Sequence, residues 1–191
     1  MRGRVWVMGA LCAGLCVGPG GVFAEETLSD RGAAAATLLE STDRHEQQLG
    51  FLRLEALREP AALPVVQRYA EHKDPELRAY GLRATAAIGG AASVPWLLER
   101  YNAERHPAVR RAILQALEPY QAASPDILPT YLRALRDRSP EIRMAAVDII
   151  SRVDDQRARD GLRERMERER HRDVRRVLDA IAASSQDPGG G

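Results

Sequence analysis

A helical motif recurs along this chain at nearly constant spacing, and this repeat limits the fold more than any other feature of the sequence. Its four copies are DPELRAYGLRATAAI from Asp74, HPAVRRAILQALEPY from His106, SPEIRMAAVDIISRV from Ser139 and HRDVRRVLDAIAASS from His171. The copies begin 32, 33 and 32 residues apart. A repeat of this length is typical of solenoid proteins, in which each unit buries its apolar face against neighbouring units.

Each copy has the pattern of a helix with a defined start. Asp74 and Ser139 are good N-capping residues, and His106 and His171 stand at the same position. A proline follows three of the four starts, at the first helical position, where a missing N–H has no cost. Apolar residues then follow at helical spacing, which predicts one buried stripe per helix. We therefore expect both histidines to act as caps or loop residues.

A second helix is predicted before each of these starts. The segments are LPVVQRYA from Leu63, VPWLLERY from Val94, LPTYLRAL from Leu128 and GLRERMER from Gly161. An earlier copy begins near Arg44 and places four leucines in the positions of this preceding helix, namely Leu49, Leu52, Leu54 and Leu57. No alternating strand pattern occurs. The sequence therefore predicts an all-α fold, an α-solenoid of about four to five helix pairs over residues 43–184.

Residues 1–24 have the three-part layout of a secretory signal peptide. Arg2 and Arg4 precede an apolar run, and small residues precede a predicted cleavage after Ala24. The alternative is an uncleaved anchor, although the run is short for a membrane span. We expect a periplasmic or secreted protein. Residues 25–42 are expected to form a mobile leader or a short helix, and residues 185–191 a disordered tail.

Charge and cysteine content exclude several function classes. Both cysteines, Cys12 and Cys16, lie in the signal segment, so the cleaved chain has no disulfide and no cysteine nucleophile. Without residues 1–24, 26 basic residues stand against 27 acidic ones, whereas a general nucleic-acid binder carries a strong positive excess. Only Lys73 among the basic residues is a lysine, a bias typical of a GC-rich genome, so an arginine alone is weak evidence of function. We expect no nucleic-acid partner.

Four short motifs carry a family resemblance: DPELR at 74–78, HPAVR at 106–110, SPEIR at 139–143 and VPWLL at 94–98. Over about residues 43–184 the chain resembles HEAT-repeat proteins, in particular the short bacterial, PBS-lyase-type repeat. HRDVR at 171–175 lacks the proline of this pattern. The resemblance implies a scaffold or adaptor that binds a protein partner and is not an enzyme.

The last predicted pair is unusually charged. Residues 152–176 mix arginines with acids at i,i+4 spacing, as in Arg163/Glu167, Glu164/Arg168 and Arg165/Glu169. This pattern favours a terminal helix with a solvated outer side, and the alternative is a docking surface.

Arginine follows the apolar fourth residue in every copy of the motif. These arginines are Arg78, Arg110, Arg143 and Arg175. The resemblance implies a structural ladder, in which such arginines bond loop carbonyls and neighbouring acids between repeats. The rival interpretation is an anion-binding strip, which unpaired, solvent-facing guanidiniums would support.

The family also contains enzymes, and the chain offers few residues for them. His106 and His171 stand two repeats apart, about 20 Å at roughly 10 Å per unit, so they cannot share a metal ion. His45-Glu46 resembles the His-Glu pairs that hold the di-iron centre of deoxyhypusine hydroxylases, but only one copy is present. Bilin lyases use HEAT-like repeats too, and the export signal argues against them. We therefore expect no cofactor and no metal.

Candidate contact residues lie on the helices that precede the motif starts, because these helices are expected to line the concave face of the solenoid. They are Arg68, Trp96, Glu99, Arg100, Arg133, Arg136 and Arg165. Trp and Arg are frequent at the energetic centres of interfaces. Our first hypothesis is an exported HEAT-like scaffold that binds a protein of the cell envelope through this face. The alternatives are a HEAT-type lyase or metal-dependent enzyme, and a structural repeat module in a larger assembly.

Overall fold

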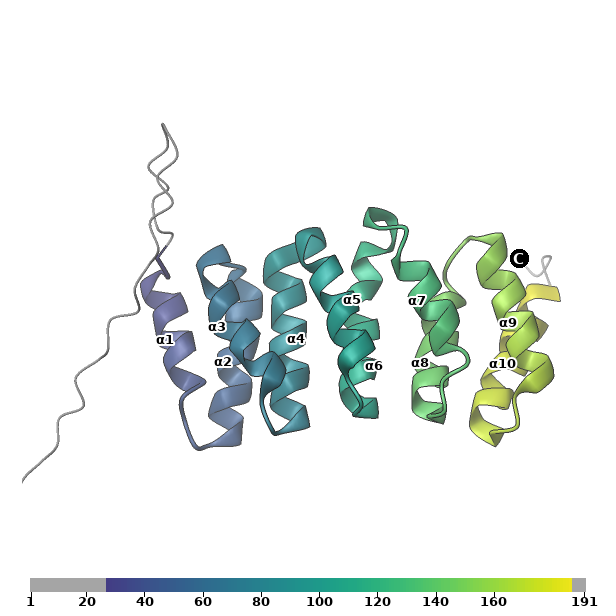
Figure 1. Ribbon diagram of the computed structural model, residues 1–191, viewed down its shortest axis with the longest axis horizontal. Coiled ribbons are helices and arrows are strands. Elements are labelled where there is room, and N and C mark those ends of the chain that lie inside the picture. The colour runs from purple at the N-terminus through teal and green to yellow at the C-terminus, as the bar shows by residue number, and fades with distance from the viewer. Residues whose placement is uncertain (1–26, 187–191) are drawn as a thin grey trace, which may run out of the picture.

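The computed structural model describes residues 27–186, which form one elongated row of helices (Figure 1). Within these residues the regular structure is entirely helical, in five successive pairs. The expected signal segment and residues 187–191 of the expected tail lie outside the described residues. The all-α solenoid predicted from the repeat is therefore the observed fold.

We call the first helix of each pair its A helix and the second its B helix. The A helices are α1 (Asp30–Leu38), α3 (Leu63–Gln67), α5 (Val94–Ala103), α7 (Ile127–Ala134) and α9 (Gln156–Arg168). The B helices are α2 (Arg44–Leu57), α4 (Pro75–Gly89), α6 (Pro107–Leu117), α8 (Pro140–Ile150) and α10 (Arg172–Gln186). Short 3₁₀ helices extend the A helices or lead into them: η1 (Pro60–Ala62), η2 (Arg68–Glu71), η3 (Gly90–Ser93) and η4 (Glu118–Ala123).

The closest packing between units is on the B side. Successive B helices pack on one another along the whole row, from α2 through α10, whereas among the A helices close packing joins α7 and α9. The A helices were expected to line a concave face. Because the B helices pack more closely, the A side is instead the more open side of the stack. Grooves between units reach the surface among the A helices, and also on the B side between α4 and α6 and along α6, α8 and α10.

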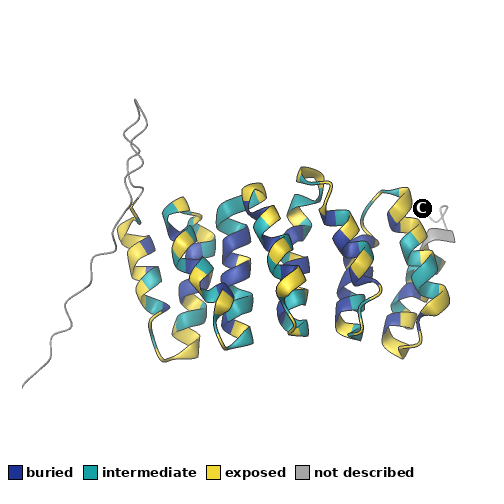
Figure 2. Cartoon of the chain, in the orientation of Figure 1, coloured by how far each residue is buried: buried dark blue, intermediate teal, exposed yellow. Residues whose placement is uncertain are grey.

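The buried stripes of the helices face one another inside the stack, as Figure 2 shows. The larger apolar cluster runs from Ala70 to Leu178 and includes Ile113 and Tyr131, both with no exposed surface. A smaller cluster at the N-terminal end includes Phe51. Each large buried apolar side chain contributes roughly 1.5–3 kcal/mol relative to an exposed one. Burial along the repeat period is therefore what holds the row together.

Close approach of helices within one unit requires a glycine on α4. A Cβ atom on Gly81 would lie 2.9 Å from the carbonyl oxygen of Val66 and 2.8 Å from Cβ of Tyr69. Any larger residue would push α3 and its 3₁₀ extension away from α4. Gly81 thus sets the spacing of the second pair.

The first unit differs from its prediction. Helix α2 is a B helix, because it stacks on α4, and Asp43 accepts from the N–H of His45 as Asp74 does from Glu76. The placement of its leucines in preceding-helix positions was therefore wrong, and Leu49 and Leu52 are 41% and 44% exposed. The capping residue Asp43 corresponds to Asp74, and this correspondence shows how the first unit aligns with the others. Helix α1, in the segment expected to be a leader or a short helix, is the A helix of this unit.

Candidate functional site on the arginine-lined A side

Three arginines of the B helices form the same ion pair with the loop of the next unit. Arg78 donates from Nε and Nη2 to Glu104 at 2.9 and 3.1 Å. Arg143 contacts Glu169 in the same way at 2.8 and 2.9 Å, and Arg110 pairs with Asp137. The side chains in these pairs are at most 20% exposed. We call these three pairs the braces, because each ties one unit to the following one.

The acids of the braces also hold the start of the next B helix. Oε1 of Glu104 accepts from the N–H of His106 at 2.7 Å, and Oε1 of Glu169 from the N–H of His171 at 2.8 Å. Asp137 accepts from the N–H of Ser139 at 2.8 Å. These acids stand two residues before each motif start, and the sequence analysis missed them. The signal was the recurring Glu-Arg-His and Asp-Arg-Ser triplets.

The expected capping by His106 and Ser139 was wrong in its chemistry. Both residues occupy the N-cap position, but neither side chain accepts a hydrogen bond from the helix. The acid two residues earlier accepts instead from the N–H of the N-cap residue itself, and it carries a charge that the positive helix N-terminus favours. Asp74, in contrast, does cap α4, through the N–H of Glu76 at 2.9 Å.

The electrostatics of the braces follow from these bonds. Hydrogen bonds from Arg143 and from the N–H of His171 outweigh burial and lower the pKa of Glu169 to about 2. Burial acts to raise the pKa of Glu104, but hydrogen bonds from Arg78 and from the N–H of His106 outweigh it, and that pKa is lowered as well. Both acids are therefore charged in the folded protein at neutral pH.

The two ends of the ladder lack a brace. At the first junction, Gln47 takes the place of the arginine and His72 that of the acid. Gln47 donates to the carbonyl of Leu39 instead. At the other end, Arg175 donates to Asp179 of its own helix at 3.1 Å and to the carbonyl of Met166 at 2.9 Å. The arginine ladder is thus built into the structure at three junctions.

A second column of arginines lies on the A helices and their extensions, four residues before the loop position of the acids. Its members are Arg68, Arg100, Arg133 and Arg165. Arg68 is exposed and makes no ion pair within the described residues. Arg100 contacts Glu71 at 2.9 Å and lies 5.0 Å from the centre of the Trp96 ring. Arg133 donates only to neutral oxygens, those of Asn102 and Thr130.

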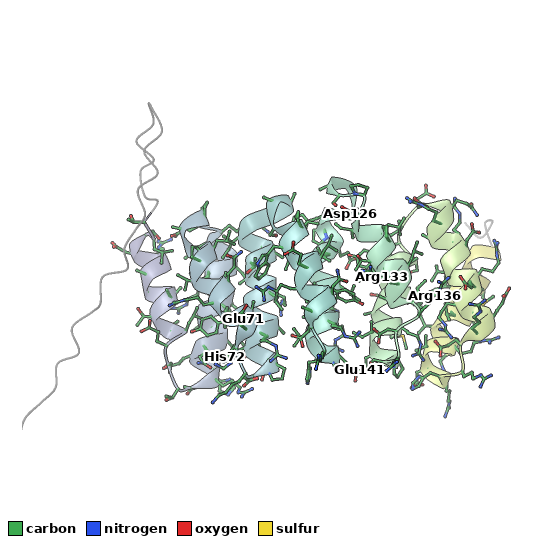
Figure 3. The ribbon with its side chains drawn as sticks, viewed as in Figure 1. Glu71, His72, Asp126, Arg133, Arg136 and Glu141 are labelled. Atoms are coloured by element: carbon green, nitrogen blue, oxygen red, sulfur yellow. The ribbon has the colours of Figure 1, made fainter. Side chains whose placement is uncertain are left out.

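The remaining candidates are divided between core and surface. Arg165 is mostly buried and contacts Glu169 at 3.2 Å and the carbonyl of Leu135 at 3.3 Å, so it belongs partly to the third brace. Trp96 is half-buried against the core and Arg100, whereas Glu99 is exposed. Figure 3 shows Arg133 and Arg136 projecting from α7 and its C-terminal turn. Arg136 is 68% exposed.

A groove of about 480 Å³ lies between α7 and α9, where these arginines gather. Leu132 and Pro129 form its apolar floor. Five arginines and two acids line it: Arg133, Arg136, Arg157, Arg165, Arg168, Asp160 and Glu164. Three of the seven candidate contact residues, Arg133, Arg136 and Arg165, thus meet in one groove.

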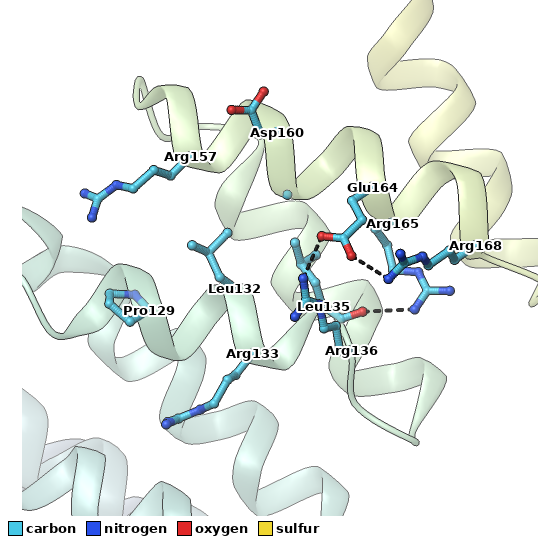
Figure 4. Close-up of a pocket in the computed structure, with 11 residues that line it drawn as sticks. Pro129, Leu132, Arg133, Leu135, Arg136, Arg157, Asp160, Glu164, Arg165 and Arg168 are labelled. Atoms are coloured by element: carbon cyan, nitrogen blue, oxygen red, sulfur yellow. Dashed lines mark hydrogen bonds and ion pairs between the residues drawn. The ribbon is translucent and has the colours of Figure 1, made fainter.

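One carboxylate serves two arginines at the centre of this groove. Figure 4 shows Glu164 between Arg136 and Arg168, at 2.6 and 2.5 Å, while Arg133 points away from it. The hydrogen bond from Arg136 is the main cause of the lowered pKa of Glu164. Arg163, expected to pair with Glu167, contacts Asp160 at 3.3 Å instead, because i,i+3 neighbours also share a helix face. Arg157 pairs with Asp155 and Arg165 with Glu169, so Arg133 is the one lining arginine without a carboxylate partner among the described residues.

Neither a metal-binding cluster nor a membrane-spanning helix occurs in the described part of the chain. No cluster of three or more His, Cys, Asp or Glu side chains with the arrangement of a metal site occurs between residues 27 and 186. No helix in this range is long and apolar enough to cross a bilayer.

Glu55 has a mostly buried carboxyl group. Burial raises the pKa of this group, and Arg83 lies 3.6 Å from it.

Comparison with known proteins gives the same fold. A search of curated protein sequences found no match. Among solved structures, the complex of CpcE and CpcF of phycocyanin lyase from Nostoc sp. PCC7120 is similar, with a TM-score of 0.65 and 21% sequence identity. The similarity covers 79% of this chain and 97% of that one. A model of HEAT repeats matches residues 31–118 and 95–182, which together make up most of the sequence. The chain therefore belongs to the HEAT-repeat family.

Proposed function

We propose that this chain is a HEAT-repeat adaptor that binds an acidic region of a partner protein on its A side, around the groove between α7 and α9. The observation that carries the proposal is the arginine-rich lining of that groove, in which Arg133 has no carboxylate partner among the described residues and Arg136 and Arg168 share Glu164. Guanidinium groups bind carboxylates with two parallel hydrogen bonds, and they are less strongly hydrated than ammonium groups. An apolar floor with a polar rim is also the usual anatomy of a protein interface.

The arginines of the braces differ from those of this surface in how they are paired. The brace arginines each form an ion pair with a mostly buried carboxylate, namely Arg78, Arg110 and Arg143. They therefore leave no unpaired positive charge on the surface. Arg133 has only neutral partners, and Arg136 and Arg168 share one carboxylate. An incoming acidic group would meet guanidiniums that are already ordered but incompletely paired. Such pre-organisation reduces the entropy cost of binding.

We further propose that the adaptor acts in the cell envelope, as a periplasmic or secreted protein. The support is the signal-like layout of residues 1–24. Cell fractionation and determination of the N-terminal residue of the native protein test this part. We expect a mature chain that begins at Glu25. Recovery of the intact N-terminus from the cytosol would contradict export.

Site-specific photo-crosslinking tests the binding surface. A photoreactive residue at Pro129, which is exposed in the groove, is expected to give discrete protein adducts in the source organism. The same residue at Leu49, exposed on α2 of the opposite side, is the matched control. We expect the crosslinked segment of the partner to be rich in Asp and Glu. Equal adducts from both positions, or none from Pro129, would refute the proposal.

A role in a lyase is the second candidate function. It is motivated by the structural similarity to a chain in the complex of CpcE and CpcF of phycocyanin lyase. The test is an assay of the purified chain for lyase activity on phycocyanin, alone and together with HEAT-repeat chains from the same organism. Turnover would favour this candidate over the adaptor.

A further inference from the structure

Three grooves rich in basic side chains follow one another along the A helices and their loops. The first two have equivalent linings one unit apart, and the third adjoins the second through Arg133 and Arg136. The first, of about 440 Å³, lies between the loops at 71–74 and 103–106. The second, of about 420 Å³, lies one unit further, between the loops at 104 and 136–138. The third is the groove between α7 and α9. Each contains more basic than acidic side chains.

Internal pairing leaves unpaired cations in the first two grooves. In the first, Glu104 is taken by Arg78, while the side chains of Lys73 and Arg105 are exposed and have no partner in the described residues. In the second, Asp137 is taken by Arg110, while Arg133 lacks a carboxylate and Arg138 lacks any side-chain partner in the described residues. Each of the first two grooves therefore contains two cations without a carboxylate partner in the described residues.

Two acids of the chain itself show that these positions accept a carboxylate. Glu71, 73% exposed, contacts Arg100 in the first groove at 2.9 Å. Glu164 contacts Arg136 and Arg168 in the third. Each of these two carboxylates contacts its arginine from the solvent side, which is where a carboxylate of another molecule would bind. The chemistry that fits the grooves is therefore that of Asp or Glu side chains.

The spacing of the grooves sets the spacing of those carboxylates. Neighbouring units stack roughly 10 Å apart, since packed helices have interaxial distances of about 8–10 Å. An extended chain advances about 3.3 Å per residue, so three residues cover one unit. We infer that the A side binds an extended peptide segment of the partner with an acidic residue at every third position, one in each groove. This inference rests on the proposed function and adds the sequence pattern of the partner.

Two synthetic peptides of equal composition test the inference directly. One repeats Gly-Ser-Asp so that an acid falls at every third position, and the other places the same three aspartates next to each other. Fluorescence anisotropy with the full chain at physiological ionic strength is expected to show about tenfold tighter binding of the first peptide. Equal affinities, or no binding of either peptide, would overturn the inference. Photo-crosslinking at Pro129 would remain a separate test of the adaptor proposal.

A matched pair of variants locates the binding site. Exchange of the four free cations for glutamine, as Lys73→Gln, Arg105→Gln, Arg133→Gln and Arg138→Gln, is expected to abolish the preference between the two peptides. The control exchanges four exposed arginines outside the grooves that also lack an ion pair in the described residues, namely Arg53, Arg58, Arg172 and Arg176. It removes the same charge and should keep the preference. Loss of the preference in both variants would also overturn the inference, and circular dichroism confirms that both are folded.

Discussion

The arginines of the B helices and those of the A helices repeat with the same period, yet they lie in different surroundings. Arg143 is 12% exposed and its partner Glu169 is 1% exposed, whereas Arg136 is 68% exposed and shares Glu164 with Arg168. The difference comes from the loop between the two helices of each unit. An acid there faces the B helix of the preceding unit and pairs with its arginine. The A side has no acid that recurs in this way.

This difference distinguishes arginines that hold the units together from arginines that are available to bind a partner. A guanidinium that holds two buried hydrogen bonds with a carboxylate cannot exchange its partner without leaving a buried charge. A guanidinium on the open side can exchange partners at little cost, because water solvates it. In a chain with 27 arginines, residue type therefore says little about function. Whether an arginine is structural or available for binding depends on the group with which it pairs.

The largest effect is expected from breaking a brace. Arg143→Gln leaves Glu169 buried without its main partner and should lower the free energy of unfolding by about 3 kcal/mol. Arg133→Gln on the A side should change it by less than about 0.5 kcal/mol, as expected for an exposed residue without a carboxylate partner. Urea unfolding followed by circular dichroism measures both. Similar losses in the two variants would mean that the comparison between the two sides is wrong.

Acid should weaken the same brace. The folded pKa of Glu169 is about 2, below its ordinary value of 4.5. A carboxyl with a lowered folded pKa stabilises the protein above the unfolded pKa, and this contribution disappears as pH falls through the folded one. We expect a loss of up to about 3 kcal/mol between pH 4.5 and pH 2. Unfolding of the wild type and of Glu169→Gln across this range gives the difference, which should shrink toward low pH. A constant difference would contradict the pairing.

A brace can also be added where the chain lacks one. Gln47→Arg together with His72→Glu restores the residue types of the other junctions at the first one. The pair should stabilise the protein by about 1 kcal/mol, since a new pair of this kind is partly solvated. Each single exchange should give less than half of this gain. Thermal or urea unfolding of the four proteins forms a double-mutant cycle, and a coupling energy near zero would show that the columns are not equivalent.

A small effect, between those of Arg143→Gln and Arg133→Gln, is expected at Arg100, which lies between the two classes. It contacts exposed Glu71 and the ring of Trp96. Arg100→Gln should cost about 0.5 kcal/mol, from an exposed ion pair and a cation–π contact. Urea unfolding beside Arg133→Gln provides the comparison. A loss as large as that of Arg143→Gln would place Arg100 among the structural arginines.

Most of the fold follows from the repeat in the sequence. The motif starts at 74, 106, 139 and 171 lie one residue before the first residues of α4, α6, α8 and α10. Proline at the first helical position and an apolar stripe are local signals, so they can be read without the structure. The first unit was misplaced because it has no proline after Asp43 and no arginine in the position of Gln47.

The candidate site was predictable only in part. The acids of the braces were present in the repeated triplets, but His72 interrupts their column and hid the pattern. Which arginines lie in one groove could not be predicted, because it depends on the angle between successive units and on side-chain conformations. The pair of Glu164 with Arg168 follows from i,i+4 spacing on α9, whereas Arg136 reaches Glu164 from the preceding unit, which no spacing within one helix indicates.

The braces have a consequence for how such a chain can grow. The third and fourth units each contribute an acid to the unit before and an arginine to the unit after, and Arg110 and Asp137 form the brace between them. A duplicated stretch of residues 106–138 would therefore bring both halves of a new brace and leave the old ones intact. Gene duplication could lengthen this protein one unit at a time without compensating mutations. Each added unit would also extend the row of grooves, so that the length of the acidic segment it can bind would be set by the number of repeats.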